Sequence, residues 1–281
     1  MPALLGVRRD IEAMQALWGR LYRALDELLG PTCTQLPLGD PTYGLATATT
    51  FTGRRKETVG LAPTWTWSEA PSAFDAPLRP TWESSYQGII PILELNGSDE
   101  EADTPDAAYW TSASGFSLAL WILLDDITSV DLLGRWDLTT GSELREFRLF
   151  VDSSSQLSGV VYDETANAQI GQLSARALVA GRWYHLAMTY GGGTTSTSVR
   201  LYVNGARDDT ATSASGAFVA KQNTATLTRL GMNIATGGGQ GSFFNGKLAG
   251  GPAGPLFEQA EWTPMAVRAL YEKTRAWMAL P

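Results

Sequence analysis

The stretch GRWYHLAMTYGGGTTSTSVRLYVNG, residues Gly181–Gly205, decides the fold class. Trp183–Tyr190 and Val199–Val203 are rich in aromatic and β-branched side chains, which favour β-strands. Gly191–Gly193 and the Ser/Thr run that follows predict a loop between these two strands. Asn204-Gly205 suits a tight type I′ turn, because both central positions of that turn need positive φ angles. A third strand should therefore follow at once, and the stretch predicts antiparallel sheet.

Short runs of the same character recur across the second part of the chain, and turn residues separate them. We expect strands at residues 89–95, 116–124, 132–138, 146–151, 157–162, 183–190, 199–203, 225–232 and 244–248. Many short strands without intervening helices predict a sandwich or jelly roll. Thr263 and Pro264 then form an N-cap and N1 pair that starts a C-terminal helix. The buried face of this helix should hold Val267, Leu270, Tyr271, Thr274, Trp277 and Met278.

The order of these motifs resembles the laminin-G-like, concanavalin A-type jelly roll. Leu95–Asp99 matches the apolar strand ending in Asn-Gly-x-Asp with which that family opens, and Phe116–Trp121 matches its Phe-Ser-Leu-x-x-Trp strand. Gly181–Tyr190 and Val199–Gly205 match its two central strands, and Phe244–Gly246 matches its closing Phe-Asn-Gly. The resemblance implies an all-β fold, an antiparallel two-sheet jelly-roll sandwich, with an N-terminal α-helix, an extended arm and a C-terminal helix added to it.

We expect three segments: an amphipathic helix over residues 1–30, an extended Pro/Trp-rich arm over 31–87, and the jelly-roll domain with its C-terminal helix over 88–281. In the first segment apolar residues recur in heptad steps of three and four, and Gly30-Pro31 ends the pattern. Two interpretations stay open, since such a helix can pack on its own domain or contact a partner such as a second copy of the chain. The stripe consists of Leu4, Val7, Ile11, Met14, Trp18, Leu21, Leu25 and Leu28.

The arm lacks any periodicity, and its prolines disfavour both helices and central strands. Trp65, Trp67 and Trp82 need cover, because an exposed tryptophan leaves a large apolar area in water. We therefore expect these three residues to anchor the arm, either on its own domain or on a neighbouring protein.

Composition narrows the function classes. A net charge of −8 argues against a nucleic-acid binder, because phosphate neutralisation needs basic patches. No run approaches the apolar length of a membrane span, and the N-terminus lacks the pattern of a signal peptide, so we expect neither membrane insertion nor secretion by that route. One cysteine, Cys33, allows no internal disulfide. One histidine, His185, lies mid-strand and should be a core residue, which leaves no catalytic triad and predicts that the protein is not an enzyme.

Carboxylates offer two further possibilities. The run Glu101-Ala102-Asp103-Thr104-Pro105-Asp106 loosely resembles the Glu-x-Asp-x-x-Glu strand of some glycosidases on this fold, but Pro105 predicts a loop instead. The resemblance also implies calcium at the sandwich rim, where Asp99 matches the rim aspartate of the family and Asp103 is near it. Lys247 stands where relatives often carry acidic residues, so the expected cofactor is calcium or none.

Two functions remain. Jelly rolls of this kind with a long N-terminal extension and no secretion signal resemble structural proteins of tailed-phage virions. This predicts a non-enzymatic capsid decoration, tail or connector component that is located in the virion and assembled in the host cytoplasm with protein partners and further copies of itself. The alternative is a carbohydrate-binding module that recognises surface glycans through aromatic rings, with Trp110 and Trp136 as candidate contacts.

Overall fold

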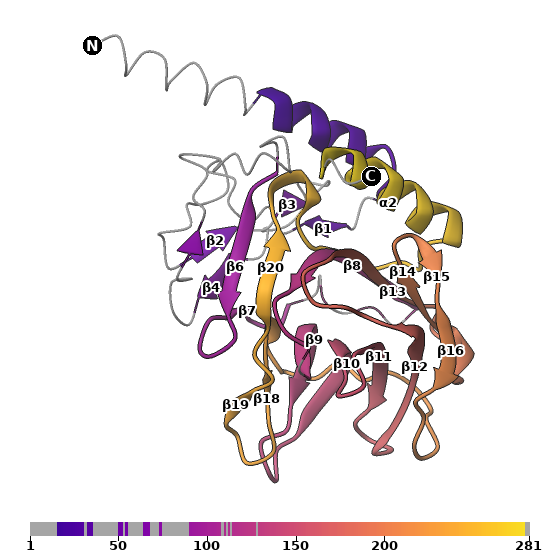
Figure 1. Cartoon of the computed structure of the whole chain (residues 1–281). Helices are drawn as coiled ribbons and strands as arrows, with labels where there is room; N and C mark the ends of the chain where they lie inside the picture. The colour runs from indigo at the N-terminus through magenta and orange to yellow at the C-terminus, as the bar shows by residue number, and fades with distance from the viewer. Residues whose placement is uncertain are drawn as a thin grey trace.

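The structure is a computed structural model of the whole chain. It describes residues 16–30, 33–35, 90–107, 110, 112, 114–127 and 129–278, together with the backbone of the strands at 50–52, 54–55, 64–67 and 73–74. Two antiparallel sheets, A and B, stack into a sandwich, and helices lie on the outer side of sheet A (Figure 1). The all-β jelly-roll prediction, with a helix near each end, is confirmed.

Sheet A carries the strands that the opening stretch predicts. Its order is β15 (Ala206–Arg207), β14 (Val199–Val203), β13 (Trp183–Tyr190), β8 (Phe116–Leu124), β20 (Asn245–Ala249), β6 (Ile92–Asn96) and β5 (Ala73–Phe74). Three more strands extend it, namely β21 (Leu256–Glu258) beside β8, β1 (Thr34–Gln35) beside β21, and β3 (Arg54–Arg55) beside β1. The predicted bounds of β8, β13 and β14 are met residue for residue.

Sheet B forms the other layer. Its order is β16 (Asp209–Thr212), β12 (Ala168–Ala177), β11 (Gln156–Asp163), β10 (Leu144–Val151), β9 (Val130–Asp137), β17 (Thr228–Leu230), β7 (Ala102–Thr104), β4 (Thr64–Trp67) and β2 (Thr50–Thr52). A small hairpin, β18 (Asn233–Ile234) and β19 (Gln240–Gly241), attaches to the end of β9. Two 3-10 turns, η2 (Ser196–Ser198) and η3 (Gly251–Ala253), complete the connections.

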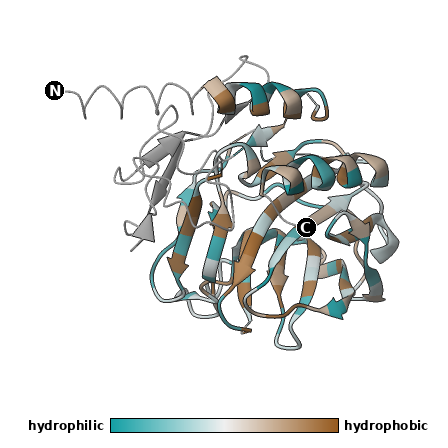
Figure 2. Cartoon of the chain, turned by 45° about the horizontal axis from the view of Figure 1, so that its top comes forward, coloured by the Kyte–Doolittle hydropathy of each residue, from teal (hydrophilic) through white to brown (hydrophobic). Residues whose placement is uncertain are grey.

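The turn after β14 behaves as its sequence predicts. Asn204 and Gly205 have φ angles of 53° and 71°, and Val203 pairs with Ala206 across the turn. Between the sheets, alternate residues of the strands form the main core, including Leu186, Met188 and Tyr190 of β13. Figure 2 shows the hydrophobic residues that run along these strands. The alternation fixes the register, since a slip by one residue would turn the core side chains outward.

Several strands of the two sheets were not expected, β12 and β7 among them. β12 reads AQIGQLSARA, and its small and polar residues have low strand propensity, so its pairing with β11 carries the assignment instead. β7 lies where Pro105 predicts a loop; this prediction is wrong, because the strand ends at Thr104, before the proline. The arm also differs from expectation, since its β4 pairs with β7 and extends sheet B. The side chains of Trp65 and Trp67, and the whole of Trp82, lie outside the described residues.

A long helix covers the outer face of sheet A. Helix α2 (Pro264–Trp277) begins with Thr263 as N-cap and Pro264 at N1, as predicted. Val267, Leu270, Thr274 and Met278 are buried, whereas Tyr271 and Trp277 are half-buried. A hydrogen bond from Trp121 Nε1 to Thr274 Oγ1, 2.8 Å long, joins β8 to α2.

Residues 16–26 form a second helix, next to α2 (Figure 1). Trp18 and Leu25 are 2% and 0% exposed, and Leu25 packs in one cluster with Leu270 of α2. Leu21 and Leu28 are half-buried. This half of the helix therefore packs on its own domain, which is one of the two interpretations that the sequence leaves open. Leu4, Val7, Ile11 and Met14 lie outside the described residues.

We expect Thr263→Ala to lower the free energy of unfolding by about 1 kcal/mol, because the Thr263 hydroxyl accepts a hydrogen bond from the Ala266 N–H at 3.1 Å. Urea unfolding would measure this difference. Thr195→Ala is the matched control, since Thr195 is the N-cap of η2 but its side chain makes no cap hydrogen bond. Equal losses in the two variants would contradict the capping role.

Candidate functional site

A row of paired residues crosses the outer face of sheet B. The inner face of β10 is marked by Phe147 and Leu149, which lie in the main core, so Arg148 between them points outward. Residues directly opposite one another share a face, and this extends the assignment across the neighbouring strands. The row runs Asp103, Arg229, Gly134, Arg148, Val160 and Gly171, from β7 to β12.

Charged groups gather at the β7 end of this row. Arg229 is 7% exposed, and its Nη2 lies 3.7 Å from Asp137 Oδ2. Burial lowers the pKa of the Arg229 guanidinium, and the carboxylates of Asp137, Glu101 and Asp103 partly offset this effect. Burial also raises the pKa of Asp103, against the opposing influence of Arg229. One cation therefore lies among three carboxylates.

Aromatic rings lie beside the charged groups. Trp136 of β9 forms a cluster with Val160 and Tyr162, separate from the main core, and its ring meets Tyr162 edge-on with centroids 5.3 Å apart. The Arg148 guanidinium carbon lies 3.9 Å from the Phe150 ring centroid and 5.8 Å from that of Trp136. The outer face thus combines rings, arginines and carboxylates on strands that hydrogen bonds hold rigid.

Two donors in this region are unsatisfied. Nη1 of Arg229 and Nε1 of Trp136 are buried and have no hydrogen-bond partner among the residues that the structure describes. Both residues are 7% exposed. Arg148, by contrast, is satisfied, because its guanidinium binds both carboxylate oxygens of Asp131, with Nη2 donating to Oδ2 at 2.8 Å.

The two predicted glycan contacts, Trp110 and Trp136, lie in different parts of the sandwich. Trp110 is 1% exposed and packs inside the main core, where its ring meets Phe257 edge-on with centroids 4.9 Å apart. Its assignment as a glycan contact is therefore wrong, because core packing encloses the ring. Trp136 lies in β9, within the strand predicted over residues 132–138, and at 7% exposed its ring is nearly covered.

The two predicted calcium ligands, Asp99 and Asp103, also lie in different elements. Asp99 lies in the turn after β6, where its Oδ1 accepts a hydrogen bond of 2.7 Å from Asn96 Nδ2. Asp103 lies in β7 opposite Arg229, whose positive charge disfavours a bound cation. No group of three or more His, Cys, Asp or Glu suited to a metal ion occurs within the described part of the chain.

Sequence reasoning missed Arg229 and Asp137. The available signal is a single charged residue inside a predicted strand, since Arg229 falls within the predicted run 225–232. That signal does not reveal its partners, because Asp137 and Asp103 come from strands far away in the sequence.

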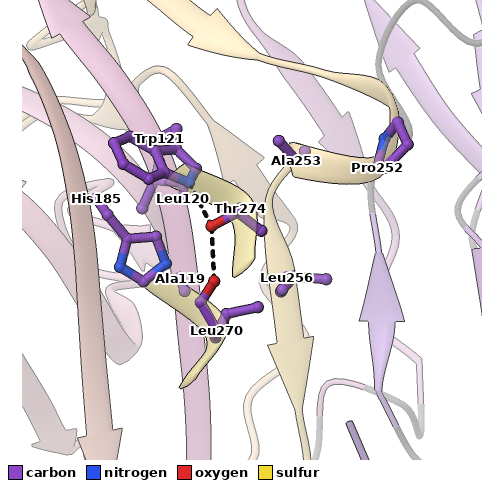
Figure 3. Close-up of a pocket in the computed structure, with 10 residues that line it drawn as sticks. Ala119, Leu120, Trp121, His185, Pro252, Ala253, Leu256, Leu270 and Thr274 are labelled. Carbon is purple, nitrogen blue, oxygen red and sulfur yellow. Dashed lines mark hydrogen bonds between the residues drawn. The ribbon is translucent and has the colours of Figure 1, made fainter. Parts of the chain in front are cut away.

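The sole histidine lies in a different place, under α2 (Figure 3). His185 is 2% exposed, as predicted, and it borders a cavity of about 10 Å³ together with Trp121, Leu270 and Thr274. Its Nδ1 has no hydrogen-bond partner among the described residues. Burial lowers the pKa of His185 from 6.5 to about 3, so the imidazole is neutral at pH 7. The cavity has room for about one water molecule, so it is too small for a substrate.

This burial predicts acid sensitivity. The pKa of His185 is 6.5 in the unfolded chain and about 3 in the folded protein. Between these two pH values only the unfolded chain is protonated at His185, so the free energy of unfolding decreases as the pH falls from about 6.5 to about 3. We expect His185→Gln to lack this contribution, and urea unfolding near pH 6 and pH 5 should show the wild type losing about 1 kcal/mol more than the variant between them. Parallel pH profiles for the two proteins would contradict the burial of a neutral imidazole.

Comparisons with known proteins agree with this architecture. A family model for the concanavalin A-like lectin/glucanases superfamily, Laminin_G_3, matches residues 96–250, more than half of the chain. The chain therefore belongs to this superfamily. No curated protein matches it in sequence. Within the described residues, no helix has the length and apolar content of a membrane crossing.

Solved structures show the same fold at low identity. The Trypanosoma rangeli sialidase is similar with a TM-score of 0.53 and 14% identity, over 88% of this chain and 33% of the sialidase. The structure of HCR/D-Sa-GBL1/C gives a TM-score of 0.50 and 11% identity, over 80% of this chain and 51% of that one. Domain 4 of a Geobacillus stearothermophilus arabinanase, solved with arabinotriose, gives 0.43 and 18%, over 64% and 76%. The chain spans about a third of the sialidase's length.

Proposed function

We propose that this chain is a non-enzymatic structural protein of a phage-like virion, a capsid decoration, tail or connector component. Its N-terminal segment attaches it to protein partners and to further copies of itself, and the jelly roll is the module that it displays. The observation that carries the proposal is the way in which the helix at residues 16–26 is mounted on the sandwich.

Hydrogen bonds as well as apolar contacts hold the helix at residues 16–26 on the sandwich. The Gly30 N–H, just past the helix, donates to Glu258 Oε2 at 3.1 Å, and Lys273 Nζ of α2 donates to Ala24 O at 2.8 Å. Downstream, Gln35 Nε2 donates to Pro252 O at 2.9 Å, and β1 pairs with β21. These bonds hold the helix at residues 16–26, and the segment after it, against the sandwich.

A helix that is held firmly on its own domain favours attachment of the chain to a partner. The heptad stripe that begins at Leu4 continues without a break into the mounted residues, so Leu4, Val7, Ile11 and Met14 are left as the part of the stripe that can serve a partner. Binding through a segment whose base is already ordered loses less conformational entropy than binding through a free tail. Apolar residues of this kind typically supply most of the energy of an interface.

The chemical groups support a non-enzymatic role. Cys33 is 3% exposed and His185 is 2% exposed, so the protein covers both side chains. A nucleophile and its base must lie within hydrogen-bond reach of each other and of the substrate. Burial keeps a substrate away from both side chains.

We expect the full chain to run as an oligomer in size-exclusion chromatography with light scattering, and Ile11→Asp to make it a monomer with an unchanged urea midpoint. Leu25→Asp serves as the contrast, because it places a carboxylate at a fully buried position and should destabilise the fold by roughly 4 kcal/mol. Glu12→Gln, on the polar face, should change neither property. A monomeric wild type, or an Ile11→Asp variant that still assembles, would reject the proposal.

Carbohydrate recognition is the second candidate. The observation that favours it is the outer face of sheet B, where the Trp136 ring, the Arg229 guanidinium and the Asp103 carboxylate lie together on rigid strands. Sugar-binding sites use this combination of planar donors, carboxylate acceptors and rings. The fold-related T. rangeli sialidase has itself been solved with sialic acid. The two functions are compatible, since they use opposite sides of the sandwich.

A further inference from the structure

The turn after β6 begins with one of three Asn-Gly pairs in the chain, which are Asn96-Gly97, Asn204-Gly205 and Asn245-Gly246. We propose that Asn96 is a site of spontaneous covalent modification, at which the Gly97 backbone nitrogen attacks the Asn96 side-chain amide and water then converts the residue to aspartate or isoaspartate. The reaction uses groups of the β6–β7 turn and water. It is independent of assembly and of carbohydrate recognition.

The reaction balances with water as its only co-reactant. The Gly97 nitrogen forms a bond to Cγ of Asn96 and gives up its proton. The bond from Cγ to Nδ2 breaks, and Nδ2 leaves with that proton as ammonia. A water molecule then opens the cyclic imide. Cleavage of the bond between Cγ and the Gly97 nitrogen yields aspartate, and cleavage of the original peptide bond yields isoaspartate.

The fold itself requires a glycine after Asn96. Gly97 has a φ angle of 71°, a conformation that residues with a side chain rarely adopt. A Cβ on Gly97 would also lie 2.6 Å from the Cβ of Asn245, closer than two such atoms can approach. The attacking nitrogen therefore belongs to a residue without a side chain, so no side chain hinders its approach to the amide.

Two backbone donors already bind the oxygen on which negative charge develops. The Ser98 N–H and the Asp99 N–H donate to Asn96 Oδ1 at 2.8 Å and 3.3 Å. Attack on Cγ turns this oxygen into an oxyanion, and donors that are in place beforehand stabilise it. The bond from Ser98 also closes an Asx-turn, which folds the amide back over Gly97. The turn thus holds the two reacting groups near each other.

A carboxylate lies at the leaving nitrogen. Asp99 Oδ1 accepts a hydrogen bond of 2.7 Å from Asn96 Nδ2. A carboxylate in this position can carry the proton from the Gly97 nitrogen to the departing amine. Asn96 and Asp99 are both exposed, so water reaches the imide to open it. Nucleophile, oxyanion donors, proton carrier and water therefore meet at one exposed turn.

The other two Asn-Gly pairs are held differently. Asn204 Oδ1 accepts a hydrogen bond of 3.0 Å from the His185 N–H in β13, and Gly205 is buried. Asn245 begins β20, and Gly246, which is buried, pairs with both neighbouring strands, β6 and β8. Burial of the two glycines restricts both water and the backbone movement that ring closure needs. These pairs are internal controls with the same local sequence.

The modification changes the turn. Conversion of Asn96 to aspartate replaces the hydrogen bond to Asp99 with two carboxylates that repel each other. Isoaspartate in addition lengthens the backbone at the end of β6, where Asn96 pairs with Asn245. Each event adds one negative charge, so the modified protein separates from the original by ion exchange. The β6–β7 turn therefore loosens as the protein ages.

The test follows all three sites in the folded full chain at neutral pH by peptide mapping and mass spectrometry. We expect Asn96 to convert about tenfold faster or more than Asn204 and Asn245, because only its turn positions the reacting groups at an exposed site. The products should include both aspartate and isoaspartate, and incubation in heavy-oxygen water should label them. In urea the three rates should converge, because the unfolded chain keeps only the shared Asn-Gly sequence.

A pair of variants tests the role of the carboxylate. Asp99→Asn should slow conversion of Asn96 about threefold or more, because it removes the group that carries the proton. Glu94→Gln is the matched control, since Glu94 is a carboxylate of the same strand that lies beside Lys247 instead, and it should leave the rate unchanged. Circular dichroism confirms that both variants fold.

Several outcomes would overturn the proposal. Equal rates at the three pairs in the folded chain would do so, as would faster conversion at Asn204 or Asn245. Aspartate without isoaspartate at residue 96 would show direct hydrolysis of the amide without the cyclic imide. An unchanged rate in folded Asp99→Asn would remove the carboxylate from the mechanism.

Discussion

Both faces of sheet A are buried along the paired strands β13 and β8, and the rest of the architecture depends on this constraint. The two strands pair without a register shift from Trp183 opposite Leu123 to Tyr190 opposite Phe116. One face, with Leu186 and Met188, fills the space between the sheets. The other face is also apolar and needs a cover, since a sheet with two apolar faces cannot leave one in water. Helix α2 and residues 16–26 supply that cover.

The covered face of sheet A carries polar side chains. Each of them must form a hydrogen bond or stay uncharged. Trp121 solves this by donating to Thr274, whose hydroxyl in turn donates to the Leu270 carbonyl at 2.7 Å. Among the described residues, His185 Nδ1 has no hydrogen-bond partner, and burial lowers the pKa of His185 to about 3, so the imidazole stays uncharged. Ring contacts with Trp121 and Tyr271 then make it behave as a small aromatic side chain. The sole histidine of the chain therefore packs between sheet A and helix α2.

Local sequence predicted much of this fold and little of the site. Strands such as β13 and β14 have high strand propensity, end in a turn with a defined pair, and meet their predicted bounds. β12 has no such local signal, because its strand state comes from pairing with β11. The candidate site could not be predicted from the sequence for the same reason, which is that its residues come together only through strand pairing. Its members come from β7, β9 and β17, and only register brings Asp103 next to Arg229, so no spacing in the sequence marks them.

The sandwich divides its two outer faces between different kinds of interaction. On sheet A, helices close the surface with apolar contacts and backbone hydrogen bonds such as Gly30 N–H to Glu258, which suits a permanent attachment. On sheet B, rings and charged groups lie on the outer face of the strands, largely buried, and Arg229 Nη1 has no acceptor among the described residues. The rigid β8–β13 pair lies between these faces and keeps them apart. The main core, with Leu186 and Met188 of β13, fills the space between the two sheets.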